Sequence, residues 1–137
     1  MSEIRLFQAR DSAKEAEAQK KWEREMDEAA ARANKATERG AEALDRLLTL
    51  AETRDSGQIP RIASFIGACW NGRRHFDLFD LRMVDGKISD DMIAVIDALR
   101  WRRKDIDNML ADANTRIVHV LERWGMYGDD QTGQAIV

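Results

Sequence analysis

The side chains that most often carry catalysis or bind metals are sparse in this chain. It has two histidines, His75 and His119, and one cysteine, Cys69. Neither histidine has a partner at the spacing of a metal site. His119 stands between Val118 and Val120, which is typical of a structural or surface position. Cys69 lies within an apolar stripe and is expected to be a core thiol, and a single cysteine excludes an internal disulfide.

A group of aspartates offers oxygen ligands of the kind that hard cations prefer. It lacks the alternating spacing of a calcium loop, and helix caps explain most of its members. The sequence also contains no phosphate-binding glycine loop, nucleophile elbow or cysteine–histidine arrangement. We therefore expect a protein that is not an enzyme and that has no cofactor and no metal. The aspartates are Asp77, Asp80, Asp85, Asp90 and Asp91.

Two basic clusters are the remaining candidates for a binding site in the body of the protein. Arginine and tryptophan suit contacts with phosphates and exposed bases, and the same residues dominate protein interfaces. The helix dipole also favours basic residues in a last helical turn. The clusters therefore leave the kind of partner open. They comprise Arg73 and Arg74 after one expected helix, and Arg100, Trp101, Arg102 and Arg103 at the end of the next.

The elements that carry these residues begin with a long helix. Residues 9–39 are rich in Ala, Glu, Lys and Arg and contain no Gly or Pro, which predicts helix throughout. The apolar stripe is narrow, because Trp22 and Met26 are followed mainly by alanines, as in a coiled-coil seam. The helix is either a solvated arm or one that engages another protein or a second copy through Trp22 and Met26. Gly40 is expected to break or bend it, which places the N-terminal arm at residues 1–40.

Residues 41–125 are expected to form a helical body whose first helices have clear boundaries. An amphipathic helix should end near Thr53. Pro60 suits the first turn of the next helix, which should run to about residue 71. Asn71 and Gly72 are typical of a left-handed cap at its end.

Aspartate and serine residues predict the next two helix starts. Asp77 is expected to cap a short helix near residues 78–84. Ser89 should cap the helix that follows, with Ile88 and Ile93 packed against each other as a hydrophobic staple.

A last long helix should run from Ile106 to Trp124, with Gly125 as its C-terminal cap. Residues 126–137 are expected to be a flexible tail. The predicted fold class is all-α, with about four helices plus a short helical turn and a long N-terminal helical arm. The expected core is Leu47, Phe65, Ile66, Trp70, Phe79, Leu81, Ile96, Leu99, Ile117 and Leu121.

The central stretch of the chain resembles a known domain. The motifs SGQ, RIASFIGACWN, FDLFDL, VD and SDDM follow one another between Ser56 and Met92. In this order they resemble a bacterial domain of unknown function found on integrative elements and plasmids of proteobacteria. The resemblance covers roughly residues 43–102. It implies a mobile-element setting and no established activity, and it assigns no functional residue.

Length and charge narrow the class of protein further. The chain has 137 residues, which suits one domain, and its 22 basic and 25 acidic residues give a formal net charge of −3. This charge indicates neither a DNA-coating polycation nor an acidic mimic of nucleic acid. No apolar run is long enough to span a bilayer, and the start of the chain does not read as a signal peptide. We therefore expect a cytoplasmic protein.

These observations favour a non-enzymatic accessory protein of a mobile element that acts by stoichiometric binding of another protein. A sharper form of this hypothesis is an anti-CRISPR-like inhibitor that sequesters or blocks a host defence complex. The alternative is a DNA- or RNA-binding accessory or regulatory protein of the element. A homodimer through the N-terminal helix is compatible with both.

Overall fold

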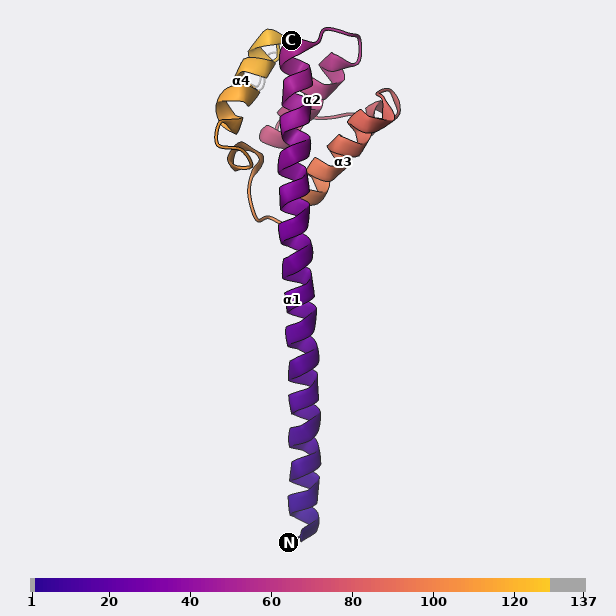
Figure 1. Cartoon of the computed structure of the whole chain (residues 1–137), viewed down its shortest axis with the longest axis vertical. Helices are drawn as coiled ribbons and strands as arrows, with labels where there is room; N and C mark the ends of the chain where they lie inside the picture. Colours follow the sequence, from indigo (N-terminus) through magenta and orange to yellow (C-terminus); the bar gives the residue numbers. More distant parts are fainter. Residues whose placement is uncertain (1, 129–137) are drawn as a thin grey trace. The chain divides into compact units, whose positions relative to one another are not determined.

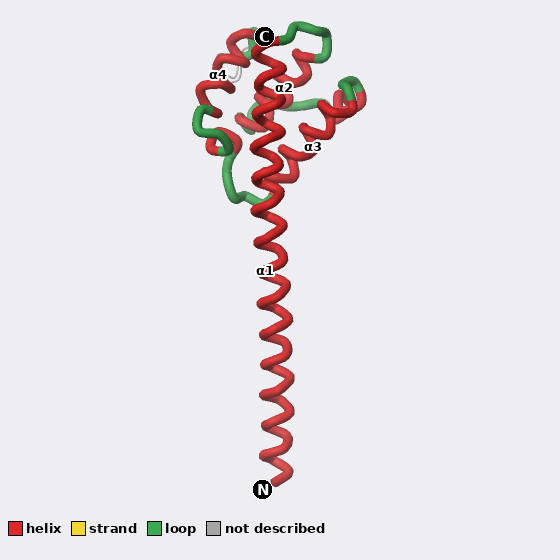
Figure 2. Tube along the Cα trace, in the orientation of Figure 1, coloured by secondary structure: helices red, strands yellow, loops and turns green. Residues whose placement is uncertain are grey.

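The chain folds into helices joined by loops. The computed structural model describes residues 2–128, with side chains from Glu3 onward. Within this part of the chain there are four α-helices, two short 3-10 helices and no strand (Figure 2). The prediction of an all-α fold with four helices and a long N-terminal helix is therefore confirmed. The elements are α1 (Ser2–Thr53), α2 (Ile59–Trp70), η1 (Leu78–Arg82), α3 (Gly86–Arg100), η2 (Ile106–Asn108) and α4 (Ala113–Arg123).

The chain divides into two compact units, Met1–Asn34 and Lys35–Val137. The described part of the first unit is helical throughout and belongs to α1. Nearly all of its side chains are exposed, and Ala33 is the only fully buried residue among those described there. Strong helix formers rather than a buried face account for helix in this unit.

In the core of the second unit, α2, α3 and α4 pack against one face of the C-terminal part of α1 (Figure 1). Leu44, Leu47 and Leu48 of α1 are fully buried at the spacing of one helical face. Ile62 and Ile66 of α2 are buried with them in the same cluster. Met92, Val95, Ile117, Val120 and Leu121 of α3 and α4 complete the largest buried side chains.

Gly40 does not break α1, contrary to the prediction. The helix continues through it to Thr53. A Cβ atom added to Gly40 would overlap the Cβ atom of Ala98 and come within 3.1 Å of the carbonyl oxygen of Ala94. The glycine therefore serves the close approach of α1 to α3 rather than a change of direction.

The predicted left-handed cap at the end of α2 is also wrong. Asn71 has an extended backbone, with φ −132° and ψ 116°. Its side-chain oxygen accepts a hydrogen bond from the N–H of Arg73 at 3.0 Å. A local side-chain turn thus ends the helix, which is a common alternative for asparagine.

The start of α3 lies three residues before the predicted cap Ser89. Asp85 is the N-cap residue, and its carbonyl oxygen accepts hydrogen bonds from the N–H groups of Ile88 and Ser89 at 2.9 and 3.0 Å. Gln58 holds Asp85 in place, because its side chain bonds both the N–H and the carboxylate of Asp85 at 2.9 and 3.0 Å. The predicted staple does not form, because Ile88 lies inside α3 and not before its cap.

The predicted last helix is two elements. η2 (Ile106–Asn108) precedes α4 (Ala113–Arg123), with an irregular stretch between them. Asp and Asn residues compete with the helical backbone for hydrogen bonds, and residues 105–114 are rich in both. The cap at Gly125 is confirmed: its φ is +70°, and Met126 N–H donates to the Leu121 carbonyl at 2.7 Å.

Two residues of the predicted core are on the surface. Phe79 is 56% and Ile96 is 39% exposed, whereas Trp70, Leu81 and Leu99 are partly buried against the core and the other predicted residues are buried in it. Of the predicted tail, residues 129–137 lie outside the described part of the chain. Met126 packs against the core, and its carbonyl oxygen accepts a hydrogen bond from Arg74 at 2.9 Å.

Candidate protein-binding surface

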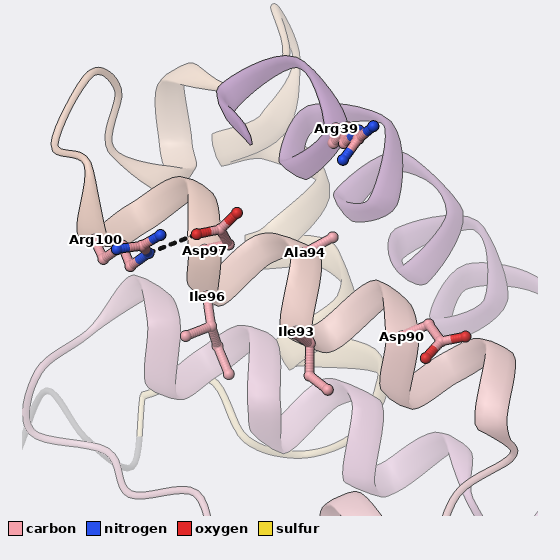
Figure 3. A pocket seen from close by; sticks show the side chains of 7 residues that line it. All are labelled: Arg39, Asp90, Ile93, Ala94, Ile96, Asp97 and Arg100. Carbon is pink, nitrogen blue, oxygen red and sulfur yellow. Dashed lines mark hydrogen bonds and ion pairs between the residues drawn. The ribbon is translucent and has the colours of Figure 1, made fainter. Parts of the chain in front are cut away.

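An open hollow on α3 is the clearest candidate site in the second unit. It has a volume of about 400 Å³. Figure 3 shows that all but one of the lining side chains come from α3 and that Arg39 comes from α1. Because one helix supplies most of the wall, nothing encloses the hollow. Its lining residues are Arg39, Asp90, Ile93, Ala94, Ile96, Asp97 and Arg100.

The middle of this α3 hollow is apolar. Ile93 and Ile96 extend from the same side of α3 (Figure 3), and their exposed fractions are 54% and 39%. They lie three positions apart, which places them on one face of the helix. The core-facing residues Met92 and Val95 are fully buried on another face. Helix α3 is therefore apolar on two sides, and the described residues cover only one of them.

The edge of the α3 hollow is charged. Arg100 donates to the carboxylate of Asp97 at 2.5 Å (Figure 3), and its guanidinium group lies 4.6 Å from the ring centre of Trp101. Asp90 and Arg39 line the same hollow. An apolar centre within a polar rim is the usual anatomy of a protein interface.

Three further apolar side chains are exposed at and just after η1. Leu78, Phe79 and Met83 are 70%, 56% and 47% exposed; we refer to them as the η1 apolar cluster. Contacts of two aspartates stabilise the backbone of this segment. Asp77 accepts a hydrogen bond from the N–H of Phe79 at 2.9 Å, which confirms the predicted cap. Asp80 pairs with Arg61 of α2 at 3.3 Å.

The two arginines of the first predicted basic cluster differ in their surroundings. Arg73 is exposed, whereas Arg74 is partly buried and its guanidinium donates to the carbonyl oxygen of Met126 at 2.9 Å. Arg74 also lies beside Gly67, where an added Cβ atom would come within 2.9 Å of its Nε atom. The hydrogen bond to Met126 joins the segment after α4 to the loop after α2. Arg74 therefore makes a contact within the second unit.

The second predicted basic cluster lies at the C-terminal end of α3. Arg100 lines the α3 hollow, Trp101 is partly buried, and Arg102 and Arg103 are exposed. Arg102 has φ +57°, a left-handed conformation that costs roughly 1 kcal/mol for a residue with a side chain. Arg100 is therefore the one predicted site residue that lines the hollow.

Trp22 and Met26 belong to the first unit and are exposed there. Their exposed fractions are 55% and 50%. They lie four positions apart in α1, so they share one face of the helix. The structure thus places the predicted arm residues at the surface.

The remaining candidates for chemistry are isolated from one another. His75 and His119 are both exposed. Burial raises the pKa of the Cys69 thiol to about 12, which disfavours the reactive thiolate. Among residues 2–128 no group of His, Cys, Asp and Glu side chains could hold a metal ion. No helix within the same residues has the length and apolar character needed to cross a membrane.

A second hollow, of about 500 Å³, lies where α1 ends and α2 and α3 begin. Gln58 and Asp85 line it, and they are bonded to each other. Lys87 and Arg54 stand in the same wall. This second hollow lies at the junction of the three helices, and its lining residues form no catalytic arrangement.

Sequence reasoning missed the apolar residues of the α3 hollow and of the η1 apolar cluster. It placed Ile96 and Phe79 in the core and Ile93 in a staple. The sequence did contain one signal. The run MIAVI in α3 has large apolar residues at more positions than a single core-facing stripe of a helix includes. An excess of this kind indicates a second apolar face.

The fold and the surface define an all-α protein with an exposed apolar hollow and no recognisable catalytic centre among its described residues. Residues 41–125 match a family of unknown function, DUF7673, and the chain belongs to this family. Comparisons with curated proteins and with solved structures find no match.

Proposed function

We propose that this protein acts by stoichiometric, non-enzymatic binding of another protein. The observation that carries the proposal is the α3 hollow, where Ile93 and Ile96 form an exposed apolar centre within a charged rim. Burying apolar side chains on association contributes about 25 cal/mol per Å² of area removed from water, before the costs of association are subtracted. Two isoleucines at the centre of an interface suit this role.

The chemistry of the hollow favours a protein over a nucleic acid. Phosphates are recognised by available cations, and the guanidinium group of Arg100 already bonds Asp97. The isoleucine side chains offer no hydrogen bond to a base edge. Asp90 and Asp97 balance Arg39 and Arg100 at the rim, so the hollow has no net positive charge to attract phosphates.

The setting that we propose is a mobile genetic element of proteobacteria, and it rests on the motif resemblance between Ser56 and Met92. In its sharper form, the partner is a host defence complex that the protein sequesters or blocks, as an anti-CRISPR protein does. Binding without catalysis fits such a role, because an inhibitor of this kind needs only to occupy a surface.

The test is an affinity capture with the tagged full-length chain from a nuclease-treated proteobacterial lysate. Ile93→Asp and Ile96→Asp place charges in the centre of the hollow and should each reduce the captured partner at least tenfold. Both side chains are exposed, so helix content and melting temperature should stay close to wild type. The identity of the captured protein then shows whether it belongs to a defence complex.

The matched control is His119→Asp, an exposed position on α4 outside the hollow. It should capture the same protein as wild type. Capture that is unchanged in both isoleucine variants would refute the proposed surface. Capture that disappears with nuclease would favour the alternative, a nucleic-acid-binding accessory protein.

A further inference from the structure

One side of α1 in the first unit carries a regular row of charges, which we call the charged row. Its members follow one another at spacings of four, three, four, four and three residues, so they lie along one side of the helix. All of them are exposed. The charged row is Arg10, Lys14, Glu17, Lys21, Glu25 and Glu28.

When the charged row is read in reverse, each position has the opposite sign to the position that it meets in the forward row. From the N-terminal end it reads plus, plus, minus, plus, minus, minus. If a second copy runs antiparallel along this side, Arg10 faces Glu28, Lys14 faces Glu25, and Glu17 faces Lys21. Each of these pairs occurs twice in such a dimer, and every pair joins opposite charges.

Like charges are neighbours at both ends of the charged row. Arg10 and Lys14 are like charges four positions apart, and Glu25 and Glu28 are like charges three positions apart. Such neighbours destabilise an isolated helix by a few tenths of a kcal/mol per pair. An antiparallel second copy places further opposite charges beside both ends, in addition to the oppositely charged neighbours within the helix.

An apolar stripe runs beside the charged row. Ala18, Trp22 and Met26 follow one another at spacings of four on the adjacent side of the helix. Trp22 and Met26 are half exposed, and Ala18 is exposed. In the register set by the charges, Trp22 of one copy lies within two positions of Ala18 of the other. A large side chain over a small one is the packing that lets two helices approach closely.

We propose that the protein forms a homodimer in which the two arms pair as antiparallel helices, with the two-fold axis near residues 19 and 20. The interface is isologous, because the same stretch, residues 10–28, contributes from each copy. Trp22 and Ala18 form its apolar centre, and the charged row sets direction and register. The paired stretch lies wholly within the first compact unit. This dimer leaves the α3 hollow to the other partner.

The test is sedimentation equilibrium of the full-length chain over a range of concentrations. Wild type should reach twice the mass of one chain. Lys14→Glu places glutamate opposite Glu25, and Glu25→Lys places lysine opposite Lys14, so each variant alone should dimerise about tenfold more weakly. An equimolar mixture of the two variants should recover the wild-type affinity, because every pair in the mixed dimer again joins opposite charges.

The controls use the other side of the same helix. Lys20→Glu makes the same chemical change as Lys14→Glu but lies opposite the apolar stripe, so it should leave dimerisation unchanged. Trp22→Ala should weaken the dimer at least tenfold. Leu6→Ala, an exposed residue that precedes the paired stretch 10–28, should not. Circular dichroism confirms that each variant stays helical.

Three outcomes would overturn the antiparallel dimer: a wild-type chain that stays monomeric at high protein concentration, single charge variants that dimerise as wild type does, or a mixture that remains as weak as its components. The result is separable from the proposed function, because Ile93→Asp lies in the α3 hollow and should leave sedimentation unchanged.

Discussion

Arg116 of α4 connects two helices of the second unit through one side chain. Its guanidinium donates to Asp45 at 2.6 Å and to Glu52 at 2.7 Å, and it reaches the hydroxyl of Thr49 at 3.2 Å. All three acceptors lie on α1 at spacings of three and four residues. The hydrogen bond with Glu52 is the main cause that raises the pKa of Arg116 above its ordinary value.

We predict that Arg116→Met lowers the free energy of unfolding by about 1–2 kcal/mol. Bonds between charged groups contribute about 1.5–3 kcal/mol when buried, and the exposure of Asp45 reduces this contribution through solvent screening. Methionine retains most of the apolar stem, so the loss reports the charged bonds. Urea denaturation measures the effect.

Arg103→Met is the control for Arg116→Met, because Arg103 is exposed in a loop. Its free energy of unfolding should stay within about 0.5 kcal/mol of wild type. Equal losses in the two variants would show that the link between α4 and α1 contributes nothing specific.

At the scale of elements, the contact between α1 and α3 depends on small residues. Gly40 lies against Ala98, and Ala98 is fully buried. A second link joins the same helices, since Arg46 bonds both carboxylate oxygens of Asp91 at 2.9 to 3.2 Å. Because α3 also carries the isoleucines of the hollow, this contact positions the candidate site.

Gly40→Ala should destabilise the second unit although alanine is the better helix former. The gain in helix propensity is about 1 kcal/mol, while overpacking against Ala98 costs about 1–3 kcal/mol. Chemical denaturation should therefore show a net loss. Gly40→Ala combined with Ala98→Gly removes the overlap and leaves the summed propensity unchanged, so it should be more stable than either single variant.

The pair of substitutions forms a double-mutant cycle with a positive coupling expected between the two sites. Additive effects would show that α1 and α3 can move apart at no cost. In that case the close approach at Gly40 would not hold α3 in place.

For the whole molecule, the two compact units differ in what holds them. The residues of the hydrophobic core lie between Ala43 and Leu121, within the second unit. The first unit contributes none of them. Core packing does not hold the helix of the first unit, so it depends on helix propensity and on a partner such as the second copy proposed here.

Deletion of residues 2–28 should therefore leave the midpoint of urea denaturation close to that of the full chain at low protein concentration. The same deletion should abolish dimerisation, because it removes Trp22 and the charged row. The two measurements are urea denaturation followed by circular dichroism and sedimentation equilibrium. A large fall in the midpoint would show that the first unit also stabilises the second.

The sequence by itself determined the features that depend on near neighbours along the chain. Helix propensity identified residues 9–39 of α1, Pro60 marked the start of α2, and Asp77 and Gly125 identified a helix start and a helix end. Each of these features satisfies its hydrogen bonds or backbone angles within a few residues. Local sequence contains that information in full.

The tertiary structure alone decided the features that depend on distant residues. Gln58 sets the start of α3 from 27 positions away, and Ala98 gives Gly40 its role. The candidate site shows the same division. The residue type alone marked Arg100 as a candidate for binding, whereas the sequence did not predict that Ile93 and Ile96 are exposed in the α3 hollow. An apolar side chain does not reveal which of its helix faces a neighbour covers, since that is settled only when the helices pack.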